Sequence, residues 1–315
     1  MLRLTETDVA ELIDVRGALE AVERGLLAEA DGQAQTLQKN VIPYDDGAHA
    51  LHVLSAVAPG LRVSGVKTWV QAGATAQPML MLFDSETAHP LALIEANVLS
   101  NLRTGALAGI ATKHLAPTNA DTLGIIGSGK QAAMMIQAIS AVRPLRSIRI
   151  WSPNPANRKI LADKVQQELG IHATAESTVT DTLADASIVG FAARVQQPII
   201  SSGMIAQGAH INSIGTTVPG KSELPQEIFS RFSTICADSP VTVRSLSDEF
   251  RLRYASEQDW HAVQRLADIV ASKAHRSESA DLTLYKGMGT GIADLAMGAA
   301  LLERATACGN RYRQS

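Results

Sequence analysis

Several features that would tie a protein to a disulfide scaffold, a membrane or a nucleic acid are scarce in this sequence. Two of its 315 residues are cysteines, Cys236 and Cys308, which excludes a disulfide framework and offers no ligand set for a metal. Aromatic residues make up only 4%, and the net charge of −3 gives no reason to expect contact with nucleic acid or a membrane surface. Both cysteines have apolar neighbours, so we expect buried thiols in a reducing compartment.

The N-terminal segment MLRLTETDVAEL alternates charged with apolar residues, and it resembles neither a signal peptide nor a membrane span. We therefore expect a cytoplasmic protein. The hydrophobic share of 46% and the charged share of 19% are typical of a globular chain, and 315 residues are many for one hydrophobic core. Length and composition together predict two domains.

Residues 1–118 predict an α+β domain. Residues 5–31 contain two helical patterns, whereas residues 36–95 contain short strands that Gly, Pro and Asp interrupt, as in an antiparallel sheet. Residues 99–115 then predict a helix rich in alanine and glycine, which Pro117 ends. We expect the C-terminal segment 291–315, with a helix over 292–307, to complete this domain.

Between residues 119 and 290 the pattern changes to strands that alternate with helices. This order predicts a doubly wound parallel sheet, the Rossmann arrangement, and hence an α/β protein. We expect an element of this alternation at 198–205, a helix at 260–272, and a strand with a glycine turn at 283–291. The substrate of such a fold sits at the carboxyl ends of the parallel strands, so we expect it between the two domains.

The stretch Thr122–Ala132, TLGIIGSGKQA, predicts a buried strand, a glycine turn and the start of a helix. Gly127 allows the tight turn, Gly129 lets a pyrophosphate approach the backbone, and Ala132 lets the helix pack closely on the strand. The helix N-terminus offers unpaired N–H groups and a positive dipole end to the phosphates. Because a second strand follows at 147–151, as the motif requires, we predict a dinucleotide-binding site.

The end of that second strand indicates which dinucleotide binds. Folds that bind NAD usually carry Asp or Glu there to hold the ribose 2′-hydroxyl, but no acid occurs between Trp151 and Asp163. Ser152, Asn154 and Arg158 would instead donate hydrogen bonds to a 2′-phosphate. We therefore favour NADPH and keep NADH as the alternative, in which case Arg158 is a solvated helix residue.

Two cations lie in segments that are otherwise apolar or small. Lys67 belongs to the strand GVKTWV, and Arg103 to the small-residue helix. Solitary cations are costly in such places unless each meets an anion. They could be exposed at their tips or form an internal ion pair. Ahead of a dinucleotide site, they could also clamp a substrate carboxylate, with Arg103 as a bidentate fork and Lys67 as a point charge.

Seven stretches together form a specific combination that extends over nearly the whole chain: GVK at 65–67, LFD at 82–84, LRTGALAGIA at 102–111, GIIGSGKQA at 124–132, IRIWSPNPANR at 148–158, IGTTVPGKSEL at 214–224 and KGMGTGIADLA at 286–296. In these stretches the chain resembles the ornithine cyclodeaminase/μ-crystallin family of NAD(P)-dependent enzymes. The family includes ornithine cyclodeaminases, ketimine reductases, pyrroline-2-carboxylate reductases and some alanine dehydrogenases. The resemblance implies a homodimer joined through the first domain.

By this resemblance, Lys67 and Arg103 match the residues of the family that bind the substrate carboxylate. A further Arg of the family lies four residues before the proline of the second strand, where this chain has Lys39 ahead of Pro43. Cyclodeaminases carry an Asp that engages the substrate amine where this chain has Thr217. The missing carboxylate counts against ornithine, whose cationic amino group needs a negative partner.

We therefore predict NAD(P)H-dependent reduction of a cyclic imine carboxylate, Δ1-pyrroline-2-carboxylate or its six-membered homologue, to L-proline or L-pipecolate. The alternatives are an ornithine cyclodeaminase, an alanine-type dehydrogenase and a protein that binds NADPH without turnover. His52 is either a strand histidine with a local partner or a substrate contact. Asp294 either interacts favourably with the helix N-terminus or binds the carboxamide or the substrate nitrogen, and Lys67 could donate a proton if burial lowered its pKa. The predicted cofactor contacts are Thr104, Gly127, Ser128, Gly129, Lys130, Gln131, Ser152, Asn154, Arg158 and Gly215.

Overall fold

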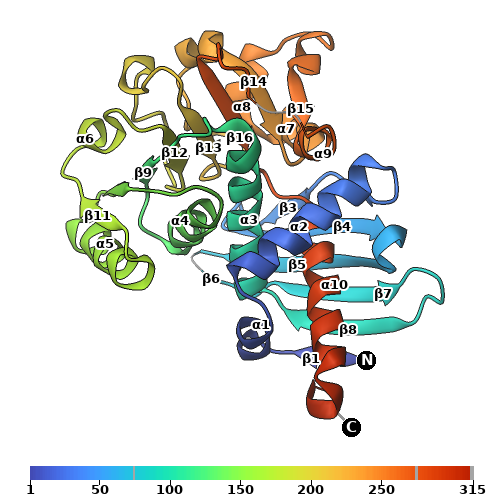
Figure 1. Cartoon of the computed structure of the whole chain (residues 1–315). Helices are drawn as coiled ribbons and strands as arrows, with labels where there is room; N and C mark the ends of the chain where they lie inside the picture. The colour runs from blue at the N-terminus through green and yellow to red at the C-terminus, as the bar shows by residue number, and fades with distance from the viewer. Residues whose placement is uncertain (74, 274–275, 313–315) are drawn as a thin grey trace. The chain divides into compact units, whose positions relative to one another are not determined.

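The computed structural model describes residues 1–73, 75–273 and 276–312, and its chain divides into two compact units. Unit 1 comprises Met1–Ala106 and Gly289–Ser315, and unit 2 comprises Leu107–Met288. The boundary at residue 106 falls inside the helix α3 (Asn97–Leu115). Figure 1 labels this helix and the other main elements of the chain. Among the described helices, none combines the length and the hydropathy that crossing a bilayer requires.

Unit 1 contains an eight-stranded sheet in the order β1-β8-β7-β5-β4-β2, with β3 paired to β4 and β6 paired to β5. Its pairings are antiparallel except for β1 with β8, so the predicted antiparallel sheet is confirmed and gains a parallel strand at its edge. The strands are β1 (Leu2–Leu4), β2 (Gln35–Thr36), β3 (Asn40–Tyr44), β4 (His49–Ala58), β5 (Val63–Ala72), β6 (Thr75–Ala76), β7 (Met79–Asp84) and β8 (Pro90–Glu95).

The first two helices of unit 1 begin at side-chain caps. Thr5 and Asp8 form a capping box at the start of α1 (Glu6–Leu12), and Asp14 caps α2 (Val15–Ala30), so both predicted N-terminal helices are confirmed. Helix α10 (Gly291–Ala307) packs against α2, β4 and β5, and η1 (Pro59–Leu61) and η5 (Gly309–Tyr312) are short 3₁₀ turns.

Gly291 explains how α10 approaches the sheet. A Cβ atom at Gly291 would lie 2.6 Å from the backbone oxygen of Ser55 on β4, closer than real Cβ contacts come. The absence of a side chain therefore lets the first turn of α10 rest on the strand backbone. This contact places Asp294, which is fully buried, over the face of the sheet that carries Leu54 and Ala56.

Unit 2 contains an all-parallel sheet in the order β11-β10-β9-β12-β13-β16-β14-β15, which confirms the predicted doubly wound fold. Its strands are β9 (Thr122–Ile126), β10 (Ser147–Trp151), β11 (His172–Ala175), β12 (Ile188–Phe191), β13 (His210–Ser213), β14 (Phe232–Ala237), β15 (Val263–Arg265) and β16 (Leu282–Lys286). Its helices and 3₁₀ turns are α4 (Lys130–Val142), α5 (Pro155–Leu169), α6 (Val179–Leu183), η2 (Ser202–Met204), η3 (Gln226–Arg231), α7 (Pro240–Leu246), α8 (Asp248–Arg253), η4 (Asp259–Ala262) and α9 (Leu266–Ala271).

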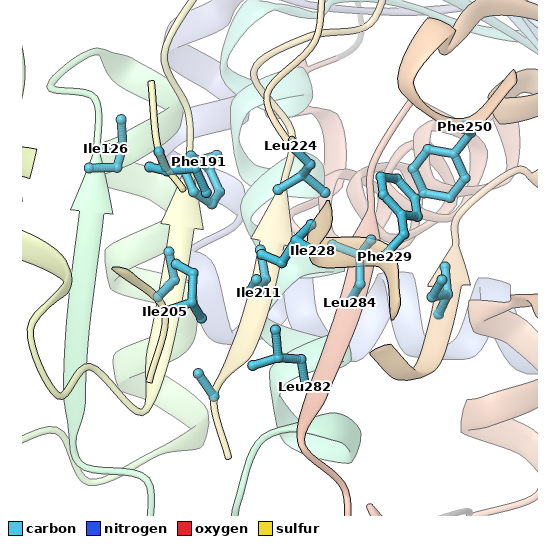
Figure 2. Close-up of a cluster of buried hydrophobic side chains, with 14 of the residues drawn as sticks. Ile126, Phe191, Ile205, Ile211, Leu224, Ile228, Phe229, Phe250, Leu282 and Leu284 are labelled. Atoms are coloured by element: carbon cyan, nitrogen blue, oxygen red, sulfur yellow. The ribbon is translucent and has the colours of Figure 1, made fainter. Parts of the chain in front are cut away.

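Figure 2 shows the apolar core on one side of this sheet, where side chains of β12, β13 and β16 meet those of the segments that follow β13. Phe229 and Phe250 pack edge to face with their ring centroids 5.2 Å apart. Phe250 comes from α8, so its packing in this core fixes the position of that helix.

Three expectations are wrong in detail. The expected helix at 260–272 is a 3₁₀ turn, the strand β15 and a helix of six residues, because Val263–Arg265 pair with β14 instead of continuing a helix. The expected element at 198–205 contains only the turn η2. Cys236 is buried as expected, but Cys308 is exposed because it lies just past the end of α10.

Candidate active site

The glycine turn of unit 2 has the conformation that a dinucleotide site needs. Gly127 adopts a φ of 131°, and a Cβ there would lie 2.9 Å from the backbone of Ala192, so only glycine fits. Gly129 is the N-cap of α4 without a side-chain cap, and a Cβ there would meet no described atom within 4 Å. The first turn of α4 therefore faces open space, which suits the close approach of a pyrophosphate to the helix N-terminus.

The predicted 2′-phosphate residues lie together at the end of β10. Ser152 is buried, and the hydroxyl of Ser128 in the glycine turn donates to its Oγ at 2.9 Å. Asn154 caps α5 by accepting from the backbone N–H groups of Ala156 and Asn157. Arg158 is half-buried and donates from its guanidinium to the backbone oxygen of Ser152 at 2.7 Å. This contact holds the guanidinium beside the strand end.

The other predicted cofactor residues divide between the two units. Lys130 and Gln131 begin α4 directly after the glycine turn. Thr104 lies in the unit 1 part of α3, and its hydroxyl donates to the backbone oxygen of Ser100. Gly215 follows β13, and its N–H donates to Oε1 of Glu223 at 3.0 Å, so this N–H is already engaged.

In unit 1 the fold brings Lys67, Arg103 and Asp294 together from β5, α3 and α10. The Lys67 ammonium donates to Oδ1 of Asp294 at 2.6 Å and to the hydroxyl of Ser100 at 3.0 Å. Nε of Arg103 lies 3.1 Å from the same Oδ1. The other carboxylate oxygen, Oδ2, is buried without a hydrogen-bond partner among the described residues. The expected internal ion pair therefore exists, and it leaves one carboxylate oxygen able to accept a further hydrogen bond.

Two further predicted residues belong to unit 1: Lys39 directly precedes β3, and His52 lies on β4. Both are 7% exposed, and Lys39 is close enough for its charge to lower the pKa of both Lys67 and His52. The His52 ring stacks on Trp69 with centroids 4.6 Å apart, so His52 has a local partner on the neighbouring strand, as the first of its two interpretations expects. Nδ1 of His52 is nevertheless buried without a hydrogen-bond partner in the described part of the chain.

We call Lys39, Lys67, Arg103 and Asp294 the cation cluster. Lys67 and Arg103 contact the Asp294 carboxylate, and Lys39 lies close enough for its charge to act on Lys67. Burial and the charge of Arg103 lower the pKa of Lys67 from 10.5 to about 7, although Asp294 pulls it upward. Burial and the charge of Lys39 lower the pKa of His52 to about 4, so its imidazole is neutral at neutral pH. Buried cations are costly unless an anion pairs with them, and a carboxylate ligand would add such an anion beside Lys67 and Arg103.

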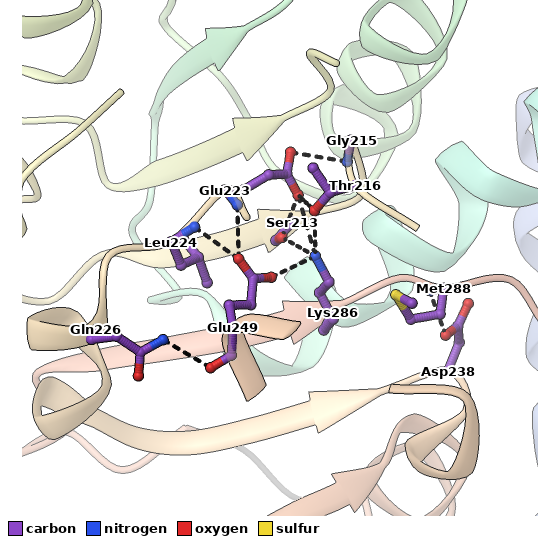
Figure 3. Close-up of polar contacts among 10 residues, drawn as sticks. All are labelled: Ser213, Gly215, Thr216, Glu223, Leu224, Gln226, Asp238, Glu249, Lys286 and Met288. Atoms are coloured by element: carbon purple, nitrogen blue, oxygen red, sulfur yellow. Dashed lines mark hydrogen bonds and ion pairs between the residues drawn. The ribbon is translucent and has the colours of Figure 1, made fainter. Parts of the chain in front are cut away.

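Thr217 is half-buried in the segment after β13. Residues on either side of it are held by a buried ion cluster that the sequence analysis did not predict. Figure 3 shows the buried side chains of Glu223, Glu249 and Lys286 meeting at the ends of β13 and β16. Nζ of Lys286 lies 2.7 Å from Glu249 and 3.4 Å from Glu223. Glu223 and Lys286 stand in the quoted motifs, but Glu249 belongs to DEFRLR, whose charges read as a solvated face.

Comparison with known proteins gives these arrangements a context. Residues 1–309 match the model of the ornithine cyclodeaminase/mu-crystallin family. A Δ(1)-pyrroline-2-carboxylate reductase of Bacillus cereus (strain ATCC 10987 / NRS 248) is 26% identical over 317 residues, which cover 97% of each chain.

Two solved structures extend the similarity to three dimensions. The Δ(1)-pyrroline-2-carboxylate reductase of Thermococcus litoralis, in complex with NADH and L-proline, superimposes with a TM-score of 0.91 at 28% identity over 98% of both chains. The iminosuccinate reductase of Paracoccus denitrificans, in complex with NAD⁺, gives a TM-score of 0.90 at 26% identity over 98% of this chain and 97% of that one.

The pKa of Lys67 can be measured directly. With ¹³C-labelled lysine, the Cε signal of Lys67 should titrate near pH 7, as an ammonium below this value and a neutral amine above it. Asp294→Asn should move the midpoint to lower pH, because it removes the carboxylate that favours the charged form. Lys67→Met assigns the signal. A Lys67 midpoint near 10.5 in the wild-type protein would contradict the account of the cluster.

Proposed function

The chain belongs to the ornithine cyclodeaminase/mu-crystallin family, and from this premise we propose that it is an NAD(P)H-dependent reductase of cyclic imine carboxylates. The substrate is Δ1-pyrroline-2-carboxylate or its six-membered homologue, and the product is L-proline or L-pipecolate. The observation that carries the proposal is the cation cluster of unit 1, in which the buried Lys67 and Arg103 share the Asp294 carboxylate and a third cation, Lys39, lies near Lys67. It suits a small anionic substrate with a cationic nitrogen.

In this proposal Lys67 and Arg103 hold the substrate carboxylate and Lys39 assists them. Arg103 supplies a planar fork and Lys67 a point charge, and their positive charge withdraws electrons near C2. Asp294 has a different part, because its Oδ2 is the unsatisfied acceptor of the cluster. The N–H of a substrate iminium donates to this oxygen, so the same cluster recognises both ends of an iminium carboxylate.

The chemistry is the addition of a hydride to a carbon–nitrogen double bond. A reduced nicotinamide supplies the hydride when it is bound. C2 of the substrate receives the hydride, the π electrons of the C=N bond move to nitrogen, and the nitrogen keeps its iminium proton. For a neutral imine, the Lys67 ammonium is the group of the cation cluster that can supply that proton. Burial of the cluster excludes water from the carbon that accepts the hydride.

Thr217 is the residue that separates imine reduction from cyclodeamination in this proposal. Ornithine brings a second cationic amine that needs a negative partner in a poorly solvated site, and a hydroxyl supplies none. A cyclic iminium carboxylate has no such amine. We therefore assign Thr217 and His52 to contacts with the body of the substrate ring, with the neutral His52 held in place by its stack on Trp69.

A homodimer through unit 1 fits the outer face of its sheet. Ile42 and Tyr44 of β3, Val57 of β4 and Val70 of β5 share the face opposite to Lys67, as the strand register shows, and each side chain is between 43% and 59% exposed. Apolar side chains gathered on one sheet face commonly mark an interface between copies.

A substrate panel tests the proposal. Oxidation of NADPH and NADH should be followed with each cyclic imine, with pyruvate plus ammonia, and with oxaloacetate plus ammonia, while L-ornithine is assayed for ammonia release. We expect reduction of a cyclic imine without added ammonia and no conversion of L-ornithine to L-proline. Thr217→Asp should weaken reduction of the neutral imine, because it adds a buried negative charge beside an uncharged ring that offers it no cationic partner. Rapid ammonia release from ornithine by the wild-type protein would restore the cyclodeaminase interpretation.

We further propose that NADPH is the preferred cofactor. The support is local, because Ser152, Asn154 and Arg158 gather at the end of β10 without an acidic residue beside them. The two solved relatives contain NADH and NAD⁺, so the end of β10 is where this chain is expected to differ from them.

Arg158→Ala should raise the KM for NADPH by about tenfold or more and leave the KM for NADH nearly unchanged, because a guanidinium–phosphate pair exists only with NADPH. Steady-state kinetics with both cofactors measures this difference. Lys159→Ala, which removes the exposed neighbour paired with Asp163, serves as the matched control. An equal loss for both cofactors, or a wild-type preference for NADH, would defeat the 2′-phosphate argument.

A further inference from the structure

The segment that carries Thr217 is fastened at both ends. We call residues 214–224 the Thr217 loop. Before Thr217, the Gly215 N–H and the Thr216 hydroxyl donate to the Glu223 carboxylate, at 3.0 Å and 3.4 Å. After it, the Gly220 N–H donates to Oδ2 of Asp248 at 2.6 Å. The anchors therefore bracket the residues in between.

Glu249 is the central anchor of the loop. It is fully buried at the start of α8, and its Oε2 accepts from the backbone N–H groups of Glu223 at 2.7 Å and Leu224 at 2.9 Å. Its Oε1 faces Nζ of Lys286 at 2.7 Å. One carboxylate thus joins the far end of the Thr217 loop to strand β16 (Figure 3).

Lys286 and Glu223 connect that end of the loop to the near end. Nζ of Lys286 donates to the hydroxyls of Ser213 at 3.0 Å and Thr216 at 3.1 Å, and the Ser213 hydroxyl donates to Glu223 at 2.6 Å. Burial acts to lower the pKa of Lys286, but Glu249 and Glu223 outweigh it, so the pKa lies above its ordinary value and the ammonium persists. Charged groups in so small a buried network are costly to disturb, so the network opposes release of the two ends of the loop.

We propose that Glu249 is a positioning residue, which acts through the Thr217 loop to fix where Thr217 meets the substrate. The inference rests on the proposed function, since that assigns Thr217 to the substrate. Glu249 itself touches no reacting atom. Its carboxylate holds the Glu223 and Leu224 amides, Glu223 holds Gly215 and Thr216, and the backbone between them presents Thr217. Glu249 thereby has a role in substrate specificity, although it lies far from Thr217 in the sequence.

A double-mutant cycle between Glu249 and Thr217 tests the coupling. Glu249→Gln should raise the KM for the preferred imine about tenfold and leave kcat within about twofold of the wild-type value. In a protein that already carries Thr217→Ala, the same substitution should raise the KM further by less than about twofold. The fall in Tm should be the same in both backgrounds. If Glu249 were merely structural, its replacement would lower kcat and Tm by the same amounts in the wild-type and the Thr217→Ala backgrounds, and that result would overturn the proposal.

A second variant and a control keep the test decisive if Glu249→Gln folds poorly. Asp248→Ala removes the partly exposed carboxylate that holds Gly220 and should give the same coupling to Thr217 in weaker form. Asp281→Asn breaks the ion pair with Arg231, elsewhere in unit 2, and should lower Tm without changing the imine KM.

Hydrogen–deuterium exchange separates this inference from the proposed activity, because it needs no turnover. Peptides over 214–224 should exchange faster in Glu249→Gln and in Asp248→Ala than in the wild-type protein. Their exchange rate in Asp281→Asn should equal that of the wild-type protein. Wild-type exchange of these peptides in both loop variants would refute the anchoring, whatever the substrate panel shows. Faster exchange together with an inactive wild-type protein would instead refute the proposed function alone.

Discussion

The contact between Asp294 and the two cations Lys67 and Arg103 is the interaction on which the rest of unit 1 depends. Removing three charged side chains from water is costly, and one carboxylate contacts both cations. Burial and the charge of Arg103 lower the pKa of Lys67 to about 7, although Asp294 acts to raise it. In the proposed function, a substrate carboxylate adds a second anion beside these cations.

The fold places this contact by packing backbone against backbone. Gly291 allows the start of α10 to rest on β4, and the strand pairing of β4 with β5 puts Lys67 on the same face as His52 and Trp69. Unit 2 uses the same means at its glycine turn, where Gly127 touches the backbone after β12. In both units a residue without a side chain sets the distance between two backbone segments.

Much of the fold could be predicted because local pattern and tertiary structure agree. The stretch Thr122–Ala132 contains its strand, turn and helix in eleven residues, and each is present. The prediction of one helix at 260–272 was wrong because local pattern and tertiary structure disagree there. Val263–Arg265 pair with β14, and this long-range contact overrides the local helical preference.

The residues themselves point to the candidate site most clearly where charge conflicts with its surroundings. Lys67 and Arg103 are conspicuous in apolar and small-residue segments, and they lie together in the fold. Glu249 was missed because it stands among charged neighbours and looks solvated, although the packing of Phe250 beside it carries it into the core. The chemical roles assigned to these residues stay predictions, because burial and distance describe a site and only a ligand or a reaction reveals its use.

Proton uptake on binding a carboxylate tests the central claim most directly. Titration calorimetry with L-proline, in buffers of different ionisation enthalpy, measures the protons taken up on binding. If the ligand carboxylate completes the cation cluster, Lys67 should gain a proton on binding at pH 8, and this uptake should largely vanish at pH 6, where Lys67 is already charged. Lys67→Met should bind without uptake at either pH. Binding of L-proline by the wild-type protein at pH 8 without proton uptake would contradict the account.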